Sequence, residues 1–208
     1  MLNFLIRQPE EAAILRYPYN PDHLNGNIIN RPELIFPYAS IRQQLIRMYQ
    51  HSNFESNLRH WIDRSNINDI LGDIYDGDIW KTFKSSTFGN NSEPFFNREM
   101  ADSHLGLILN VDWFQPYSNV THSTGVIYAA IANLPHEIQF KCENMLILDI
   151  LPGPNEANLH KINHYLSPIV DELKLLWQEI ILDSTAEYSE GKKIWAALIL
   201  VSCDVPAA

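Results

Sequence analysis

Three short apolar runs in the second half of the chain predict buried strands. They cover residues 105–112, 125–133 and 143–151, and turn-forming or polar residues bound each of them. A nearly continuous apolar run of this length is typical of a strand that is covered on both faces. A fourth run, 194–203, fits a strand or a helix by periodicity alone, but its Ile, Val and Trp content and its place after a helix favour a fourth core strand.

A helical pattern separates the third run from the fourth, because apolar residues there recur at spacings of three and four. Ser167 and Pro168 lie inside this pattern as a good N-cap and N1 pair. Two forms therefore stay open: one kinked helix, or two stacked helices over about 157–166 and 168–180. Asp171 and Glu172 would lie in the first turn of the second helix, where acids complement the helix dipole.

The first half of the chain is predicted to be less regular. Five prolines interrupt residues 1–39, which we expect to be an irregular lead-in. Residues 40–98 read as a helical segment and linker, with amphipathic helices over about 40–50 and 53–65. We expect the rest of that segment, residues 66–98, to be a linker that contains one docked aromatic turn. The α/β part then covers residues 99–208.

Composition narrows the classes of function. The 208 residues include 46% apolar residues, which is enough for a core, and they carry a formal net charge of −10. Tight, independent DNA binding is therefore disfavoured, because it normally needs a basic surface. No apolar run approaches the roughly 18 residues of a membrane helix, and the start lacks the features of a signal peptide. We expect a soluble, intracellular protein with no membrane partner.

Two residues at strand ends are candidates for chemistry. Asp112 and Asp204 each follow an apolar run and each precede a loop that contains proline. On neighbouring strands, two such carboxylates can share a divalent cation such as Mg²⁺. The alternative is that each aspartate only caps the turn that follows it. The residues alone leave both interpretations open.

Other reactive or aromatic side chains are interpreted as structural. Cys203 is expected to be a small buried residue at a strand end and not a nucleophile, since no histidine is placed by the sequence to activate it. Trp61, Trp80 and Trp177 lie on apolar faces, so we expect them to pack in the core or between domains and not to stack on bases.

An ordered series of short motifs resembles the transposase region of CACTA-type (En/Spm) DNA transposons. The resemblance runs from about Arg42 to the C-terminus and rests on the ordered set of motifs. The segments that carry it are 76–83, 102–117, 133–135, 151–154, 166–177 and 204–207.

The resemblance implies a catalytic core of the ribonuclease-H-like DDE/D type. For this chain we expect an incomplete α/β fold of that type: three strands, a helical layer and a fourth strand, preceded by a helical N-terminal portion. Asp112 matches the first catalytic acid of the family and Asp204 the second, and in the intact family these acids hold Mg²⁺ or Mn²⁺. The third acid of the family lies downstream of the segment matching Asp204, and the family's upstream Cys-pair element is absent.

The same resemblance implies a function. Intact relatives would cleave and join DNA by metal-dependent phosphodiester transfer, so DNA is the expected partner of the intact protein. With two of three acids, this chain is expected to be a fragment that is inactive alone and does not bind the metal tightly. The alternative is a non-catalytic transposon-derived protein that associates with itself or with full-length transposase. A nuclear location is expected from the resemblance, although the sequence contains no identified localisation signal.

Overall fold

The chain is described from a computed structural model. The residues that the structure describes are 12–15, 34–64, 71–84, 94–118, 122–157 and 159–203.

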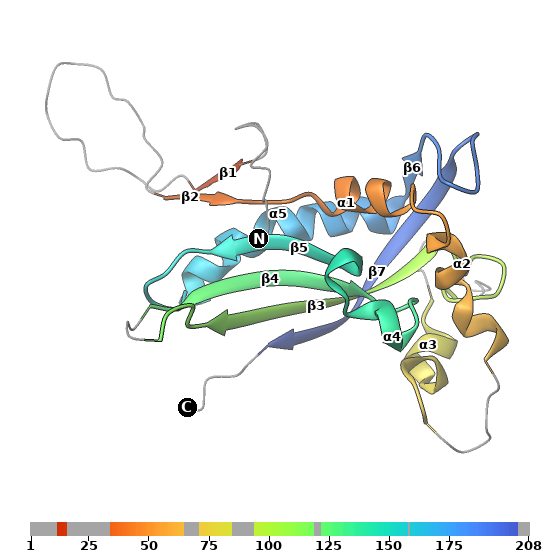
Figure 1. The fold of residues 1–208 in the computed structure, drawn as a ribbon, viewed down its shortest axis with the longest axis horizontal. Coiled ribbons are helices and arrows are strands. Elements are labelled where there is room, and N and C mark those ends of the chain that lie inside the picture. The colour runs from red at the N-terminus through yellow and green to blue at the C-terminus, as the bar shows by residue number, and fades with distance from the viewer. Residues whose placement is uncertain are drawn as a thin grey trace, which may run out of the picture.

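A five-stranded sheet forms the centre of the fold (Figure 1). Its strand order is β5-β4-β3-β7-β6; β3, β4 and β5 form an antiparallel meander, β7 runs parallel to β3, and β6 is antiparallel to β7. The strands are β3 (His104–Phe114), β4 (Thr124–Ile131), β5 (Met145–Leu151), β6 (Ile180–Leu182) and β7 (Lys192–Cys203).

The four strands expected from the apolar runs are therefore confirmed, but the expectation of only four is wrong. β6 is a fifth strand, and it occupies the position where the helical pattern was expected to end. Three residues are too few to show the period-two alternation of a strand, so no sequence pattern predicts β6.

A single helix, α5 (Leu159–Gln178), connects β5 to the β6–β7 hairpin, and Pro168 lies inside it. The interpretation of Ser167 and Pro168 as the start of a second helix is wrong. Proline inside a helix costs about 3 kcal/mol. Tyr165 and Ile169, one on each side of Pro168, are both buried in the core, and each such burial is worth roughly 1.5–3 kcal/mol, which offsets that cost.

The other elements are short. They are β1 (Ala12–Leu15), β2 (Leu34–Pro37), α1 (Ile41–Met48), α2 (Phe54–Leu58), α3 (Asp78–Thr82), α4 (His136–Gln139) and the 3-10 turns η2 (His60–Asp63), η3 (Ile74–Asp76) and η5 (Cys142–Asn144). β1 and β2 pair with each other within the segment expected to be irregular. The helix expected over 53–65 instead ends at Leu58 and continues as η2.

Two apolar clusters cover the two faces of the sheet. The main core lies between the sheet and the helices α1 and α5. On the opposite face, an aromatic cluster of Tyr75, Trp80, Phe95 and Phe96 covers the first half of β3. Trp80 and Phe96 stack with ring centroids 3.8 Å apart, and a Cβ at Gly106 would lie 3.1–3.2 Å from both rings. Glycine is therefore needed where β3 passes under the cluster.

The aromatic cluster confirms the docked aromatic turn and the packing role expected for the tryptophans. Trp80 is 2% exposed, and Trp61 and Trp177 pack partly buried against the same cluster. Among the described residues, no helix combines the length and the apolar character needed to cross a membrane.

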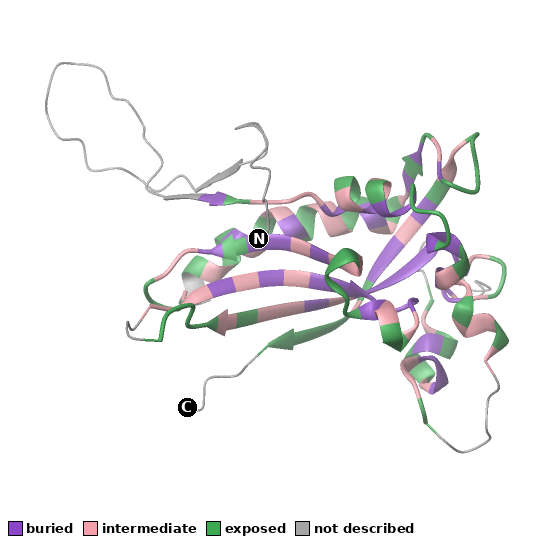
Figure 2. Ribbon diagram, viewed as in Figure 1, coloured by how far each residue is buried: buried purple, intermediate pink, exposed green. Residues whose placement is uncertain are grey.

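The second half of β7 is exposed, as Figure 2 shows. β6 pairs only with residues 192–194 of β7, so it covers only the beginning of that strand. Leu200 and Val201 are 50% and 52% exposed. Cys203 is also exposed, which corrects the expectation of a buried cysteine at this strand end.

Glu172 has a role that the sequence did not indicate. The Ser40 hydroxyl donates a hydrogen bond to its carboxylate at 2.5 Å, the backbone N–H groups of Ile41 and Arg42 donate at 2.8 and 2.9 Å, and the Tyr38 hydroxyl donates a fourth. Glu172 of α5 therefore caps the N-terminus of α1. The expectation that it complements the dipole of its own helix is wrong, because α5 is continuous through Pro168.

Replacing Glu172 with glutamine should lower the free energy of unfolding by about 1–3 kcal/mol, because an amide has one acceptor oxygen and no charge to offer four donors. Urea denaturation measures this loss. The neighbouring Asp171→Asn is the matched control, since Asp171 is 68% exposed and pairs only with Lys174 among the described residues. An equal loss in both variants would contradict the capping role.

Candidate functional site: the ends of strands β3 and β7

Asp112 lies near the end of β3 and faces solvent. Its neighbours Val111 and Trp113 pack against the main core, so the carboxylate between them projects from the opposite face of the sheet. Asp112 is exposed, and Val126 of β4 lies directly opposite it in the sheet. The aromatic cluster covers the earlier part of this face and leaves the carboxylate accessible.

β7 brings a second strand end beside Asp112. The two parallel strands finish at the same edge of the sheet (Figure 1), with Val111 paired to Cys203. Asp204 is the next residue after Cys203 in the sequence and lies outside the described residues. The convergence of the two aspartates therefore stays a prediction.

Further oxygen atoms lie on the same face. Asn110 is two positions before Asp112 on β3, and Ser202 of β7 is directly opposite Asn110. The Asn110 amide donates to the Ile108 carbonyl at 3.3 Å, and within the described residues its own oxygen accepts no hydrogen bond. Carboxylate, amide and hydroxyl oxygens are the ligands that hard divalent cations prefer. The donor chemistry at this edge therefore fits Mg²⁺ or Mn²⁺.

Comparison with known families shows to which family this chain belongs. The model of a family described as "Transposase family tnp2" matches residues 68–208, which is more than half of the chain. The chain belongs to the tnp2 transposase family. The match includes the whole five-stranded sheet and both aspartates, and it excludes α1 and α2. No curated protein matches the chain.

A second group of acids in this transposase looks like a metal site but is already paired with cationic side chains of the chain itself. Oxygens of Glu55, Asp102 and Glu187 lie within 4.8 Å of one another. Lys192 Nζ lies 2.7 Å from Glu55 Oε1 and 2.8 Å from Asp102 Oδ1, and Arg59 bonds both Asp102 and Glu187. We call these five residues the ion network. Its own cations replace a metal, so we assign it a structural role.

The pKa of Asp102 reflects the ion network. Burial alone would raise it, but the ammonium of Lys192 and the guanidinium of Arg59 hold this pKa below its usual value. Asp102 is therefore ionised at neutral pH. It joins the start of β3 to α2 and β7.

Asp149 is a buried acid whose pKa shifts in the opposite direction to that of Asp102. It lies on β5 opposite Ile127, so it faces the main core, where it is 1% exposed. Within the described residues, neither carboxyl oxygen has a side-chain hydrogen-bond partner. Burial raises the pKa of Asp149 to about 8, so the group is mostly neutral at pH 7. The sequence did not single it out, because it lies inside an apolar run.

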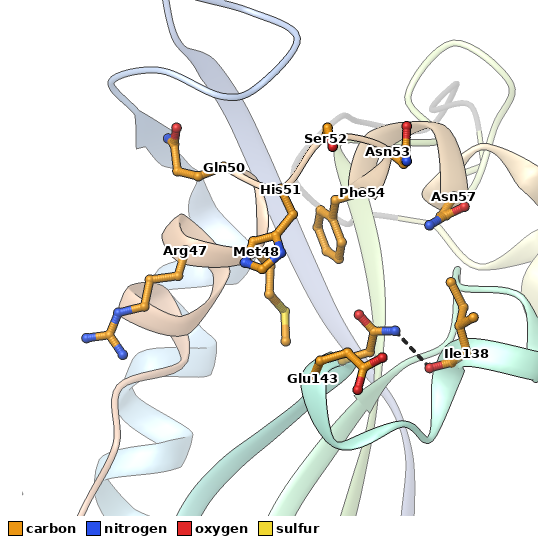
Figure 3. Close-up of a pocket in the computed structure, with 11 residues that line it drawn as sticks. Arg47, Met48, Gln50, His51, Ser52, Asn53, Phe54, Asn57, Ile138 and Glu143 are labelled. Carbon is orange, nitrogen blue, oxygen red and sulfur yellow. Dashed lines mark hydrogen bonds between the residues drawn. The ribbon is translucent and has the colours of Figure 1, made fainter. Parts of the chain in front are cut away.

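A hollow of about 680 Å³ lies at the end of the five-stranded sheet opposite to Asp112 (Figure 3). It is lined by the α1–α2 connection and by the connection from α4 to β5. Met48 and Phe54 are buried residues of its lining, and Figure 3 shows His51 beside Phe54, with Glu143 on the facing side. The hollow shares no residue with the Asp112 edge, so it is not part of the candidate site.

Proposed function

We propose that this tnp2 transposase chain carries two acids of a CACTA-type DDE/D core, Asp112 and Asp204, and that its substrate is DNA. The observation that carries the proposal is the adjacency of β3 and β7, which run parallel and are paired as far as Val111 and Cys203. The next residues along these two strands in the sequence are the two acids.

The topology supports a ribonuclease-H-like fold as part of this proposal. Three antiparallel strands are followed by a helix, and the next long strand, β7, returns to lie parallel to the first, β3. This arrangement puts the end of β7 beside the end of β3, where a pair of strand-end acids can meet.

The residues would work as follows. Asp112 would hold one side of a divalent cation from the solvent-exposed face, and Asp204 would hold the other. Asn110, whose amide oxygen is available on the same face, would accept a hydrogen bond from a water molecule at the site. A bound cation supplies charge neutralisation for the attacked phosphodiester and for the leaving oxygen. The reaction would be the cleavage and joining of DNA. It would take place in the nucleus.

Manganese titration tests the acid pair directly. Mn²⁺ is paramagnetic, so the loss of free-ion signal in electron paramagnetic resonance reports binding to the purified chain. We expect weak binding by the wild type, and roughly 10-fold or greater weakening in both Asp112→Asn and Asp204→Asn, because each removes a charged oxygen ligand.

Asp63→Asn is the control, because the Asp63 side chain is 83% exposed and pairs only with Arg98 among the described residues. Unchanged Mn²⁺ affinity in both test variants would refute the acid pair. A loss in one variant but not in the other would reject the residue that is unaffected.

A second function has one observation in its favour. The exposed second half of β7 carries Leu200 and Val201 and no charged residue from 194 to 203. Uncharged exposed strands promote strand addition by another chain. This supports a non-catalytic role in which the chain associates with itself or with full-length transposase, and light scattering during a concentration series tests self-association.

A further inference from the structure

Two exposed aromatic rings follow Asp112 in the sequence, one on β3 and one in the connection after it. Phe114 is two positions further along β3, so it projects from the same face of the sheet, and it is 46% exposed. Tyr117 follows the end of the strand by three residues and is 61% exposed. Its ring approaches the His122 ring edge-on, with centroids 6.2 Å apart.

Exposure of these rings distinguishes them from the aromatic residues at the other end of β3. Phe95 and Phe96 pack in the aromatic cluster and are 3% and 4% exposed. At the Asp112 end, the same face of the sheet lacks such a cover among the described residues, and Phe114 keeps nearly half of its surface in solvent. An aromatic face in solvent can accept a planar ligand.

Charge limits how DNA can be held at this edge. The segment 99–140, which contains β3 and β4, has no lysine or arginine, and neither does the segment 194–208. These strands therefore offer no side-chain cation for the phosphate backbone. The lack of cations weakens the binding of either form of DNA, but a single strand also exposes the faces of its bases, which duplex DNA hides.

We propose that Phe114 and Tyr117 stack on unpaired bases of the DNA next to Asp112, so that the chain takes a single-stranded or frayed DNA end and not an intact duplex. The inference rests on the proposed function, because it assigns a substrate form to the same edge. Stacking is available to every base, so this contact selects for strandedness and not for sequence.

A consequence follows for the salt dependence of binding. Affinity that comes from neutralised phosphates falls steeply with salt, with a slope of about −0.7 per phosphate contact for single strands. Stacking releases no counterions. The single-strand affinity of this chain should therefore change less than about 10-fold between 50 and 200 mM salt.

Fluorescence anisotropy with a fluorescein-labelled 12-nucleotide single strand tests the proposal. The wild type should bind this strand more tightly than a 12-base-pair duplex of the same sequence. Phe114→Ala and Tyr117→Ala should each weaken single-strand binding by about 5- to 100-fold, the range measured for loss of one base–aromatic stack. Phe140→Ala is the matched control, because Phe140 is 54% exposed but lies at the end of α4.

Three outcomes would overturn the proposal: no single-strand binding by the wild type, equal binding of single strand and duplex, or a loss in Phe140→Ala as large as in the test variants. The Mn²⁺ titration separates this failure from failure of the acid pair. Phe114→Ala and Tyr117→Ala should keep wild-type Mn²⁺ affinity. In EDTA, Asp112→Asn should not weaken single-strand binding, since stacking needs no cation.

Discussion

Replacing Lys192 with methionine is expected to lower the free energy of unfolding by about 3–5 kcal/mol, which is the cost of breaking a buried ion pair by removing one partner. The Lys192 side chain is 10% exposed and the Glu55 side chain is 1% exposed. Methionine preserves most of the volume but leaves Glu55 and Asp102 facing each other without the ammonium between them. Urea denaturation followed by circular dichroism measures the loss.

The next residue provides the control. Lys193 is 60% exposed and pairs with Glu179 at 3.2 Å, so Lys193→Met should cost less than about 1 kcal/mol. The double variant Glu55→Gln, Lys192→Met should recover part of the loss, because it removes one of the buried charges that the single variant leaves uncompensated. Similar losses at 192 and 193 would show that the ion network does not stabilise the fold as described.

Stability should fall as pH rises from 5 to 8, and Asp149→Asn should remove about 4 kcal/mol of that fall. The pKa of Asp149 is about 8 in the folded chain, against 3.8 for an ordinary aspartate. Between these values the folded chain holds a proton that the unfolded chain has released. Each pH unit therefore costs up to about 1.4 kcal/mol, and the contribution is fully present below pH 4 and lost above pH 8.

The measured quantity is the difference between wild type and variant at each pH, since the eight histidines titrate in the same range in both proteins. Asp149→Asn should be more stable than the wild type at pH 8.5, because its amide cannot ionise in the core. Asp171→Asn, at an exposed position, should keep the wild-type slope. Parallel curves for the wild type and Asp149→Asn would mean that Asp149 is ionised throughout.

The sequence predicted the parts of the fold that local patterns determine. β3, β4, β5 and β7 are nearly continuous apolar runs, and such runs identify strands without knowledge of their partners. α5 was visible by its period but not by its continuity, because local preference favoured a new helix at Pro168. Tertiary burial on both sides of the proline decided that question.

Contacts between distant residues were beyond sequence patterns. Glu172 contacts Ser40 across 132 positions and Lys192 contacts Glu55 across 137, and each of these residues alone looks like an ordinary polar or charged surface residue. Asp149 was hidden because its neighbours are apolar. These groups make or lack the buried charge contacts described above, and no local sequence pattern identifies any of them.

The candidate site could also be predicted from the sequence only in part. A strand-end aspartate can be recognised from the sequence, and Asp112 does lie at the accessible end of β3. The exposure of Phe114 and Tyr117 depends on where the covering aromatic cluster ends, which no local pattern records. The partnership of Asp112 with Asp204 stays a prediction.

The parallel pairing of β3 with β7 also affects how the chain is made. β3 is the middle strand of the sheet, and its partner residues Val111 and Cys203 are 92 positions apart. At a synthesis rate of about 5–20 residues per second, one edge of β3 waits roughly 5–20 s on the ribosome before β7 emerges. During that interval the nascent meander presents an open apolar strand, and we expect chaperone binding to be concentrated there.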